Sequence, residues 1–444
     1  MPGEAPRDPN SLAARLATQF IERNRTRFVE MGVEAEQHYD GSSVDLLFRT
    51  TTKIGAIPLI SPVTGRDDYG LVVKPRFDWS GLGPMLGEMN WKIIPTPLSL
   101  PMLPRSERKI PPWVLSTIVL HRISALLREL ERRFELVDDV RSAPRGAVNW
   151  AQYAVEHVAR GAFTSVPCRY PDLRDDRELK AGIRFTLYRQ LRGLEGQRAA
   201  GAFVLRLIDI CEHLLERVRD VAPREPAPRQ FDRWFRGTLR SDSFRDGIEA
   251  IQWTSEERGL AGLSDLQGLP WIMPMDAFFE AWVETVFAAV GRRIGGALKS
   301  GRQRGTLAPL NWNPPFVGSQ RYLLPDILLE GAATTIVVDA KYKEHWEELQ
   351  ERRWGDWEAE LRERHRADLL QALAYANVAT TPRVVVCLAY PCARGTWESL
   401  RQRGRLFHRA ALGAGVRQLD VLLTAVPMGV GAEQVATELA AELG

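Results

Sequence analysis

Two acidic residues and a lysine follow neighbouring apolar runs in the last third of the chain. Asp326 follows Pro325 within RYLLPDILLEG, and Asp339 ends the run TTIVVDAKY, in which Lys341 comes two positions later. Because side chains alternate along a strand, Asp339 and Lys341 should point to the same side. If the two runs form adjacent strands, Asp326 and Asp339 should meet at one rim of the sheet.

This pattern indicates phosphodiester chemistry. Two facing carboxylates repel each other unless a cation lies between them, and oxygen ligands with room for water suit Mg²⁺ or Mn²⁺. A lysine beside such an ion can orient or deprotonate a water molecule, or neutralise charge on a phosphate. The pattern therefore predicts a metal-dependent hydrolase that uses Asp326, Asp339 and Lys341. Taken singly, a D-x-K at a strand end is more often a surface ion pair, and Pro-Asp is common in turns.

Two helical segments contain polar residues that could join this site. In PMDAFFEAWVETVFAAVGRRI, Glu280 and Glu284 lie four positions apart on one helical face, and one of them could supply a further carboxylate. The alternative is that both acids are merely solvated. In RADLLQALAYANVAT, Gln371 and Tyr375 have the same spacing, and a helix beside the sheet would direct both toward Lys341.

Two basic segments flank these motifs. GRRIGGALKSGRQRG is expected to be a mobile glycine-rich loop, and ESLRQRGRLFHRA lies near the end of the chain. Such segments suit DNA phosphate contacts that do not read base sequence, although either could be a solvated surface. No base-contacting element is evident. The residues predicted to contact DNA are Arg292, Arg293, Lys299, Arg302, Arg304, Lys343, Arg401 and Arg403.

The composition is that of an ordinary globular protein. The 444 residues are 45% hydrophobic and 26% charged, and a net charge of +3 does not by itself identify a nucleic-acid partner. Four scattered cysteines form no zinc-binding pair and predict reduced thiols. No apolar run approaches the roughly 18 residues of a membrane span, and the first residues lack a secretory signal. We expect a cytoplasmic protein without a membrane partner.

The predicted elements divide the chain into three parts. Residues 1–112 contain a helix over 11–31 followed by short strands, so this part is expected to be rich in β-structure. Residues 113–265 are predicted to be mainly helical, with one helix over 114–137. Residues 266–444 follow the order helix, two or three strands, helix, strand, strand, which predicts an α/β unit with a largely buried sheet.

The motifs resemble those of the PD-(D/E)XK nuclease superfamily, and the Gln371 helix resembles that of its RecB-like branch. The sequence is most similar to the McrC-like family, the nuclease subunits of McrBC restriction systems. The residues that carry this resemblance are Phe279-Glu280 with Val283, Pro325-Asp326, Asp339-Ala340-Lys341-Tyr342-Lys343, and Asp368-Leu369-x-Gln371-x-Leu373-Ala374-Tyr375-Ala376. Upstream, Arg145-Gly146 and CRYPDLRDDRELKAGI resemble the family's middle region, except that Asp176 replaces an asparagine.

The resemblance implies a fold, an activity and a partner. Residues 266–444 would form a restriction-endonuclease-like mixed sheet flanked by helices. The chain would be the DNA endonuclease subunit of a modification-dependent antiviral restriction system. A McrB-type AAA+ GTPase or ATPase would dock on residues 1–112. Since this chain has no P-loop of its own, that partner would supply the nucleotide hydrolysis. The implied metal ligands are Asp326, Asp339 and Glu280, and the implied catalytic residues are these three with Lys341, Gln371 and Tyr375.

Two other functions remain open at this point. The chain could be mainly a non-catalytic activator or scaffold of an AAA+ NTPase, or it could be a RecB-like DNA repair nuclease. The presence of Asp326, Asp339 and Lys341 together favours cleavage over a scaffold, because degenerate members usually lose one such residue. Neighbouring genes would distinguish restriction from repair.

Overall fold

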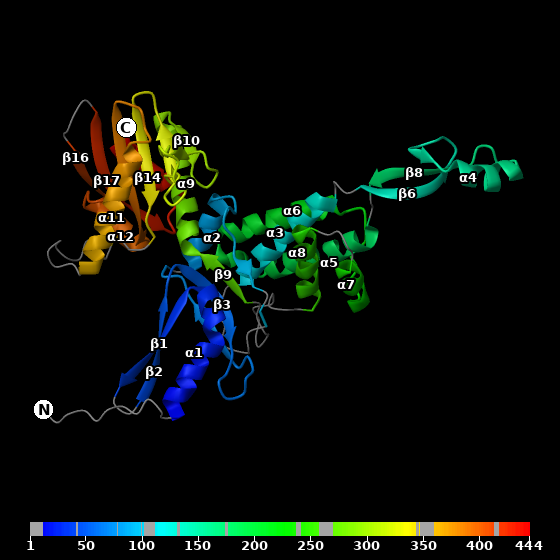
Figure 1. Cartoon of the computed structure of the whole chain (residues 1–444), viewed down its shortest axis with the longest axis horizontal. Coiled ribbons are helices and arrows are strands. Elements are labelled where there is room, and N and C mark those ends of the chain that lie inside the picture. Colours follow the sequence, from blue (N-terminus) through cyan, green and yellow to red (C-terminus); the bar gives the residue numbers. More distant parts are fainter. Residues whose placement is uncertain are drawn as a thin grey trace. The chain divides into compact units, whose positions relative to one another are not determined.

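The structure is a computed structural model with a mixed α/β fold, as the sequence predicted (Figure 1). It describes residues 12–40, 43–77, 79–98, 100–101, 112–130, 134–173, 176–236, 241–256, 270–342, 346, 359–412 and 417–444. The chain divides into two compact units. The first comprises residues 1–106, 200–203 and 269–444, and the second comprises residues 107–199 and 204–268. The predicted three-part domain division stays a prediction.

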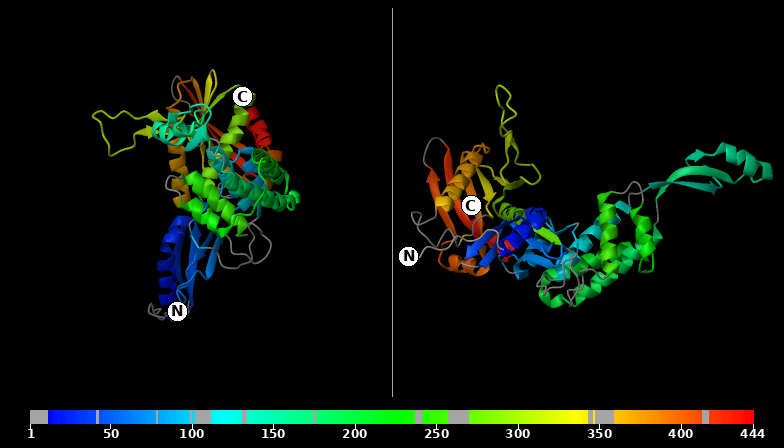
Figure 2. Two further views of the ribbon diagram at one scale, coloured as in Figure 1. Left: turned by 90° about the vertical axis from the view of Figure 1, so that its right-hand side faces the viewer. Right: turned by 60° about the horizontal axis from the view of Figure 1, so that its bottom comes forward.

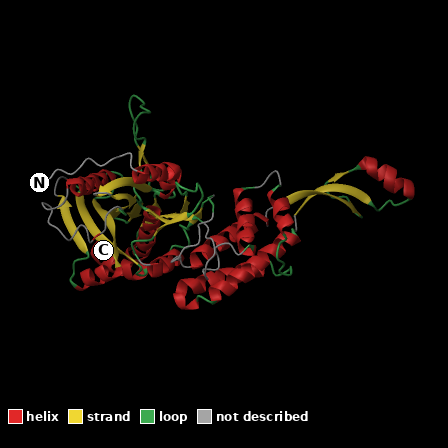
Figure 3. Cartoon of the chain, turned by 90° about the horizontal axis from the view of Figure 1, so that it is seen from below, coloured by secondary structure: helices red, strands yellow, loops and turns green. Residues whose placement is uncertain are grey.

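A six-stranded mixed sheet forms the core of the first unit (Figures 1 and 3). Its strands are, in spatial order, β10 (Ala297–Ser300), β13 (Ile327–Glu330), β14 (Thr334–Ala340), β15 (Arg383–Ala393), β17 (Gln418–Met428) and β16 (Phe407–Leu412). β14, β15 and β17 are mutually parallel, and the other pairs are antiparallel. β15 is almost wholly buried, which explains its continuous apolar sequence.

Four helices accompany this sheet. They are α9 (Met275–Ile294), α11 (Ala359–Ala376), α12 (Arg394–Gln402) and α13 (Ala432–Leu443). α9 contacts β10, β13 and β14, whereas α11 contacts β14 and β15. α9 buries Phe278, Phe279, Trp282 and Phe287 almost completely, so its apolar side chains anchor it in the core. A short hairpin of β11 (Ala308–Pro309) and β12 (Tyr322–Leu323) lies between β10 and β13 in the sequence.

The N-terminal elements of the first unit form a separate sheet from their first two strands and contribute their other three strands to a four-stranded sheet completed from far along the chain. They are α1 (Leu12–Met31), β1 (Val33–Asp40), β2 (Ser43–Thr50), β3 (Lys53–Leu59), β4 (Tyr69–Val73), α2 (Trp79–Glu88) and β5 (Thr96–Pro97). β9 (Trp271–Pro274), which directly precedes α9, pairs with both β3 and β5. The predicted N-terminal helix and short strands are therefore confirmed, and β9 joins them to the C-terminal part.

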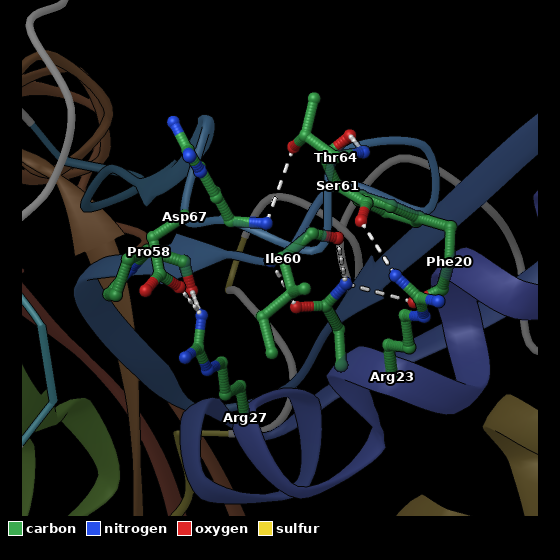
Figure 4. A network of polar contacts seen from close by, with 10 residues as sticks. Phe20, Arg23, Arg27, Pro58, Ile60, Ser61, Thr64 and Asp67 are labelled. Carbon is green, nitrogen blue, oxygen red and sulfur yellow. Dashed lines mark hydrogen bonds and ion pairs between the residues drawn. The ribbon is translucent and has the colours of Figure 1, made fainter.

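A buried polar network ties α1 to the end of β3 (Figure 4). Asn24 Nδ2 donates hydrogen bonds to the carbonyl oxygens of Phe20 and Ile60, each at 2.9 Å, and Asn24 Oδ1 accepts from the Ile60 N–H at 2.7 Å. One turn later, Arg27 forms an ion pair with Asp67. Asn24 is completely buried, so its amide satisfies backbone groups that would otherwise lack partners.

The second unit combines helices with a small sheet. Its elements are α3 (Pro112–Leu130), β6 (Phe134–Arg141), β7 (Ala147–Val148), α4 (Trp150–Gln152), the short turns Tyr153–His157 and Val158–Arg160, β8 (Val166–Leu173), α5 (Arg177–Glu195), α6 (Ala202–Arg217), α7 (Pro228–Phe235) and α8 (Asp242–Ser255); the turn Arg198–Ala200 precedes α6. Asp176 caps α5 by accepting the Leu179 N–H at 3.1 Å.

The helix predicted over 114–137 is wrong at its C-terminal end. α3 ends at Leu130, and β6 begins at Phe134 and pairs antiparallel with β8. Periodicity could not reveal this pairing, because the partner strand lies about 30 residues further along the chain. All four cysteines are free and buried. Among the described helices, none combines the length and apolar character that crossing a membrane requires.

Candidate active site

Asp326 and Asp339 lie on neighbouring strands, as their sequence context predicted. β13 and β14 pair antiparallel with Ile327 opposite Val338, which places Asp326 opposite Asp339 at the end of the ladder. Asp326 Oδ2 accepts a hydrogen bond from the Ala340 N–H at 2.8 Å. Asp339 is only 3% exposed. The two carboxyl groups therefore share one partly dry rim of the six-stranded sheet.

Lys341 is held by polar groups from β14 and α11. Its Nζ lies 2.8 Å from Asp339 Oδ2 and 3.3 Å from Asp368 Oδ1. The same ammonium donates to Gln371 Oε1 at 2.9 Å, and Gln371 Nε2 donates to the Tyr375 hydroxyl at 2.8 Å. Strand alternation and helical spacing thus bring these side chains together as expected. Gln371 contacts the lysine directly.

Asp368 is a site residue that the sequence analysis named only as part of the family motif, without a role. It is 4% exposed and contacts the Lys341 ammonium. A signal was available, because Asp368 lies three positions before Gln371 and therefore on the same face of α11. His365 continues this polar face, and its Nδ1 lies 3.1 Å from the Tyr390 hydroxyl. The buried face of α11 therefore combines the polar His365 and Asp368 with Ala372, Tyr375 and Ala376.

Burial raises the pKa values of both acids of the pair. Burial, followed by repulsion from Asp339, raises the pKa of Asp326 to about 8, against the hydrogen bond from the Ala340 N–H. Burial also raises the pKa of Asp339, although Lys341 opposes the shift. Burial lowers the pKa of Lys341, but attraction to Asp339 and Asp368 outweighs it and leaves that pKa above its ordinary value. Lys341 is therefore an ammonium at neutral pH.

Glu280 and Glu284 have different surroundings despite sharing a helix. Glu284 is 5% exposed, pairs with Lys92 Nζ at 2.8 Å and accepts from Ser300 Oγ at 2.9 Å. The alternative of a solvated Glu284 is therefore wrong. Burial raises the pKa of the half-buried Glu280, and repulsion from Asp339 contributes to the shift. Glu280 is thus coupled electrostatically to Asp339.

The carboxyl pair fits part of a divalent metal site. Asp326 and Asp339 offer hard oxygen atoms from facing positions of β13 and β14, and two such carboxylates repel each other unless a cation lies between them. In the part of the chain that the structure describes, no three His, Cys, Asp or Glu side chains gather closely enough to form a metal site on their own. Mg²⁺ commonly keeps several waters, so two protein carboxylates suit it.

The predicted mobile loop after α9 is wrong. Arg292 and Arg293 belong to the last turn of α9 and pair with Glu433, at 2.6 and 3.0 Å. Lys299 lies on β10 and pairs with Glu330 at 2.8 Å. The segment is ordered because β10 adds to the sheet beside β13, a long-range pairing that its glycine content obscured.

The other predicted DNA contacts are surface residues, apart from Lys343, which lies outside the described residues. Arg302 donates to the Ala277 carbonyl at 3.2 Å, and Arg304 is exposed. Arg401 pairs with Glu438 at 2.7 Å, and Arg403 donates to the Ser399 carbonyl at 3.1 Å. Surface pairs of this kind are weak, at most about 1 kcal/mol, and would readily exchange for a phosphate. Their role in DNA binding stays a prediction.

Comparison with known proteins places the chain in a family. The sequence profile of the McrBC 5-methylcytosine restriction system components matches residues 99–391. No curated protein matches significantly. Two solved structures are similar. One is a refined half-complex from a tetradecameric assembly of Thermococcus gammatolerans McrB AAA+ hexamers with bound McrC, with a TM-score of 0.40 and 13% identity over 97% of this chain and 94% of that chain. The other is the Thermococcus gammatolerans McrBC complex, with a TM-score of 0.26 and 14% identity over 64% of this chain and 83% of that chain. Because the profile spans most of its length, the chain belongs to the McrBC 5-methylcytosine restriction system component family.

Proposed function

We propose that this chain is the DNA endonuclease subunit of a McrBC-type, modification-dependent restriction system, with a PD-(D/E)XK nuclease site. It would hydrolyse phosphodiester bonds of double-stranded DNA with Mg²⁺ or Mn²⁺, in defence against phage. The observation that supports this most directly is the Lys341 ammonium, 2.8 Å from Asp339 at the rim that also carries Asp326. Family membership favours restriction over the alternative of a RecB-like repair nuclease.

The acidic side chains and the lysine would have different roles in the proposed reaction. Asp326 and Asp339 would hold the divalent ion, with Glu280 as a supporting acid, and the bound ion would supply a Lewis acid. Lys341 stays protonated because Asp339 and Asp368 raise its pKa. As an ammonium it would stabilise the negative charge that builds on the phosphate.

The hydrogen-bonded chain on α11 would keep the ammonium in place. Gln371 accepts from Lys341 and donates to Tyr375, so the Tyr375 hydroxyl fixes the orientation of the amide whose oxygen holds the lysine. A charge held in advance costs no reorganisation when the phosphate reacts. Gln371 and Tyr375 are assigned this assisting role in the proposed reaction.

A AAA+ motor of the McrB type would be the partner. In the Thermococcus gammatolerans assembly, McrC is bound to McrB AAA+ hexamers. We extend this to the present chain, with residues 1–112 as the docking part. Mixing the chain with the AAA+ protein encoded beside it should stimulate GTP or ATP hydrolysis. If the chain stimulates hydrolysis but never cuts DNA under any metal condition, it is the non-catalytic activator and the nuclease proposal is wrong.

The test of catalysis is substitution of the lysine and one acid. Lys341→Ala and Asp339→Ala should each lower DNA cleavage by about 100-fold or more, because each removes a group that acts in the transition state. Cleavage of 5-methylcytosine-containing plasmid, with the AAA+ partner and Mg²⁺, measures the effect.

Lys180→Ala is the matched control, since that lysine pairs with Asp220 in the second unit and is not among the predicted site or DNA-contacting residues. Circular dichroism should show that all three variants remain folded. Undiminished cleavage by both site variants would contradict the proposed function.

A further inference from the structure

A projecting hairpin carries aromatic side chains that are exposed on its surface. Residues 307–323, here called the aromatic hairpin, run out along β11 and return along β12 (the yellow-green loop in Figure 2). Every residue from Pro309 to Tyr322 is exposed. Trp312, Phe316 and Val317 are exposed by 45%, 58% and 78%. Large apolar groups gathered at one exposed place mark a binding surface.

The hairpin's own hydrogen bonds hold these rings in place. The Leu310 N–H donates to the Arg321 carbonyl at 2.7 Å, and Trp312 Nε1 donates to the Gln320 carbonyl at 2.8 Å. The Trp312 and Phe316 rings meet edge to face, with their centroids 6.2 Å apart. An aromatic pair arranged before its ligand arrives loses less entropy on binding.

The charge of this stretch favours a nucleic acid as the ligand. Residues 301–325 contain three arginines, Arg302, Arg304 and Arg321, and no aspartate or glutamate. Across the described residues, neither Arg304 nor Arg321 forms an ion pair. Basic groups that contact phosphates, together with aromatic rings that stack on bases, are the combination by which proteins bind DNA strands.

The base of the hairpin is joined to the candidate active site. Thr306 Oγ1 donates to the Pro325 carbonyl at 2.5 Å, and the Gly301 N–H donates to the Asp326 carbonyl at 2.7 Å. From Pro309 to Phe316 the chain spans at most about 25 Å. This is less than one turn of B-DNA, about 34 Å. A duplex whose phosphate reaches Asp326 therefore lies within reach of the aromatic tip.

We propose that the aromatic hairpin binds DNA bases within one helical turn of the cleaved phosphate. Arg304 and Arg321 contact phosphates, and Trp312 and Phe316 stack on or between bases. This inference rests on the proposed DNA-cleaving function and adds a base-contacting element that the sequence analysis did not find.

DNA binding by the full chain tests the hairpin separately from cleavage. Fluorescence anisotropy with duplex DNA, in Ca²⁺ without Mg²⁺, compares the parent with a Trp312→Ala/Phe316→Ala variant and an Arg304→Ala/Arg321→Ala variant. The aromatic variant should bind about tenfold more weakly or worse, with an unchanged salt dependence. The arginine variant should lower the slope of log K against log salt by about 0.9 per lost contact.

A fluorescent base reports the contact itself. Duplexes with 2-aminopurine at successive positions along one helical turn should brighten with the parent at one or two positions, because unstacking relieves quenching, and not with the aromatic variant. Trp150→Ala is the control, since Trp150 is a still more exposed tryptophan (67%) and belongs to the second unit.

The possible outcomes separate the two proposals. Unchanged DNA affinity of the aromatic variant, or no DNA binding by the parent, overturns the hairpin proposal. So does an aromatic variant that keeps its DNA affinity but no longer stimulates the AAA+ partner, since the hairpin would then be a protein-docking surface. Hairpin-dependent DNA binding without metal-dependent cleavage supports the hairpin and contradicts the nuclease function.

Discussion

At the scale of single residues, the site contains three buried charged side chains, Asp339, Asp368 and Lys341, whose charges partly compensate one another. Asp339 and Asp368 contact the Lys341 ammonium from β14 and α11, at 2.8 and 3.3 Å. Among the described residues, Asp326 forms no ion pair with a cation, and burial followed by repulsion from Asp339 raises its pKa to about 8. The lysine therefore neutralises the charge of Asp339. An ionised Asp326 would need a metal ion to compensate its charge, and otherwise it holds a proton.

Asp368 is predicted to position Lys341 without touching the substrate. Asp368→Asn removes one of the charges that hold the ammonium, so kcat should fall about tenfold or more while KM stays unchanged. Asp368→Glu should recover part of the loss. Steady-state cleavage kinetics measure both constants, with Glu363→Gln, an exposed acid on the same helix, as control. A rise in KM at constant kcat would contradict the positioning role.

The pKa of Asp326 predicts how stability depends on pH without metal. The carboxyl titrates near 3.8 when unperturbed and at about 8 in the folded chain. Between these values the folded state retains a proton that the unfolded state has lost, so this group makes stability fall as pH rises from about 4 to about 8.

Asp326→Asn removes that penalty. In chelator, the variant should be more stable than the parent at pH 9, by about 1 kcal/mol or more, and about equal to it near pH 4. Urea unfolding at both pH values measures the difference, with the exposed Asp209→Asn as control. A stability difference that does not change with pH would show that Asp326 is not perturbed.

At the scale of elements, polar contacts fix how helices meet strands. The side chain of Asn24 on α1 takes the place of a backbone partner for Ile60, just beyond β3. The apolar cluster of Phe20, Phe28, Met31 and Ile57 surrounds this junction. The cluster supplies the stability of the contact, while the amide sets the position of the helix along the strand.

Asn24→Ala should therefore destabilise the first unit by about 1–3 kcal/mol, because the Ile60 N–H loses its partner in a buried place. Arg25→Ala, on the exposed side of the same helix, should change stability by less than about 0.5 kcal/mol. Thermal unfolding compares the two variants. Equal losses would indicate that water replaces the amide.

At the scale of the whole molecule, the ends of the chain belong to one compact unit. β9 pairs with β3 and β5, Lys92 pairs with the buried Glu284, and Glu88 accepts the Ala432 N–H at the start of α13, at 2.7 Å. The candidate active site is therefore supported by residues from the first hundred positions. A nuclease domain confined to the C-terminal part would lose all of these contacts.

A fragment of residues 270–444 should consequently be several kcal/mol less stable than the intact chain, because Glu284 would be left as a buried charge without its lysine. Urea unfolding followed by circular dichroism measures this. Adding residues 1–106 as a second polypeptide should restore the cooperative transition. A fragment as stable as the whole chain would show that the C-terminal part folds independently.

The sequence by itself determined the local features of the site. Period-two alternation placed Asp339 and Lys341 on one side of β14, and four-residue spacing placed Gln371 and Tyr375 on one face of α11. These relations depend on backbone geometry within one element, so no other part of the chain is needed to predict them.

Only the tertiary structure decided which elements meet. In it, Glu284 pairs with Lys92, whereas the charge of Asp339 contributes to the raised pKa of Glu280. Asp368 contacts Lys341, and part of the expected loop forms strand β10. Each outcome depends on a partner distant in sequence, and the energy of such a contact comes from packing and desolvation that local spacing does not encode.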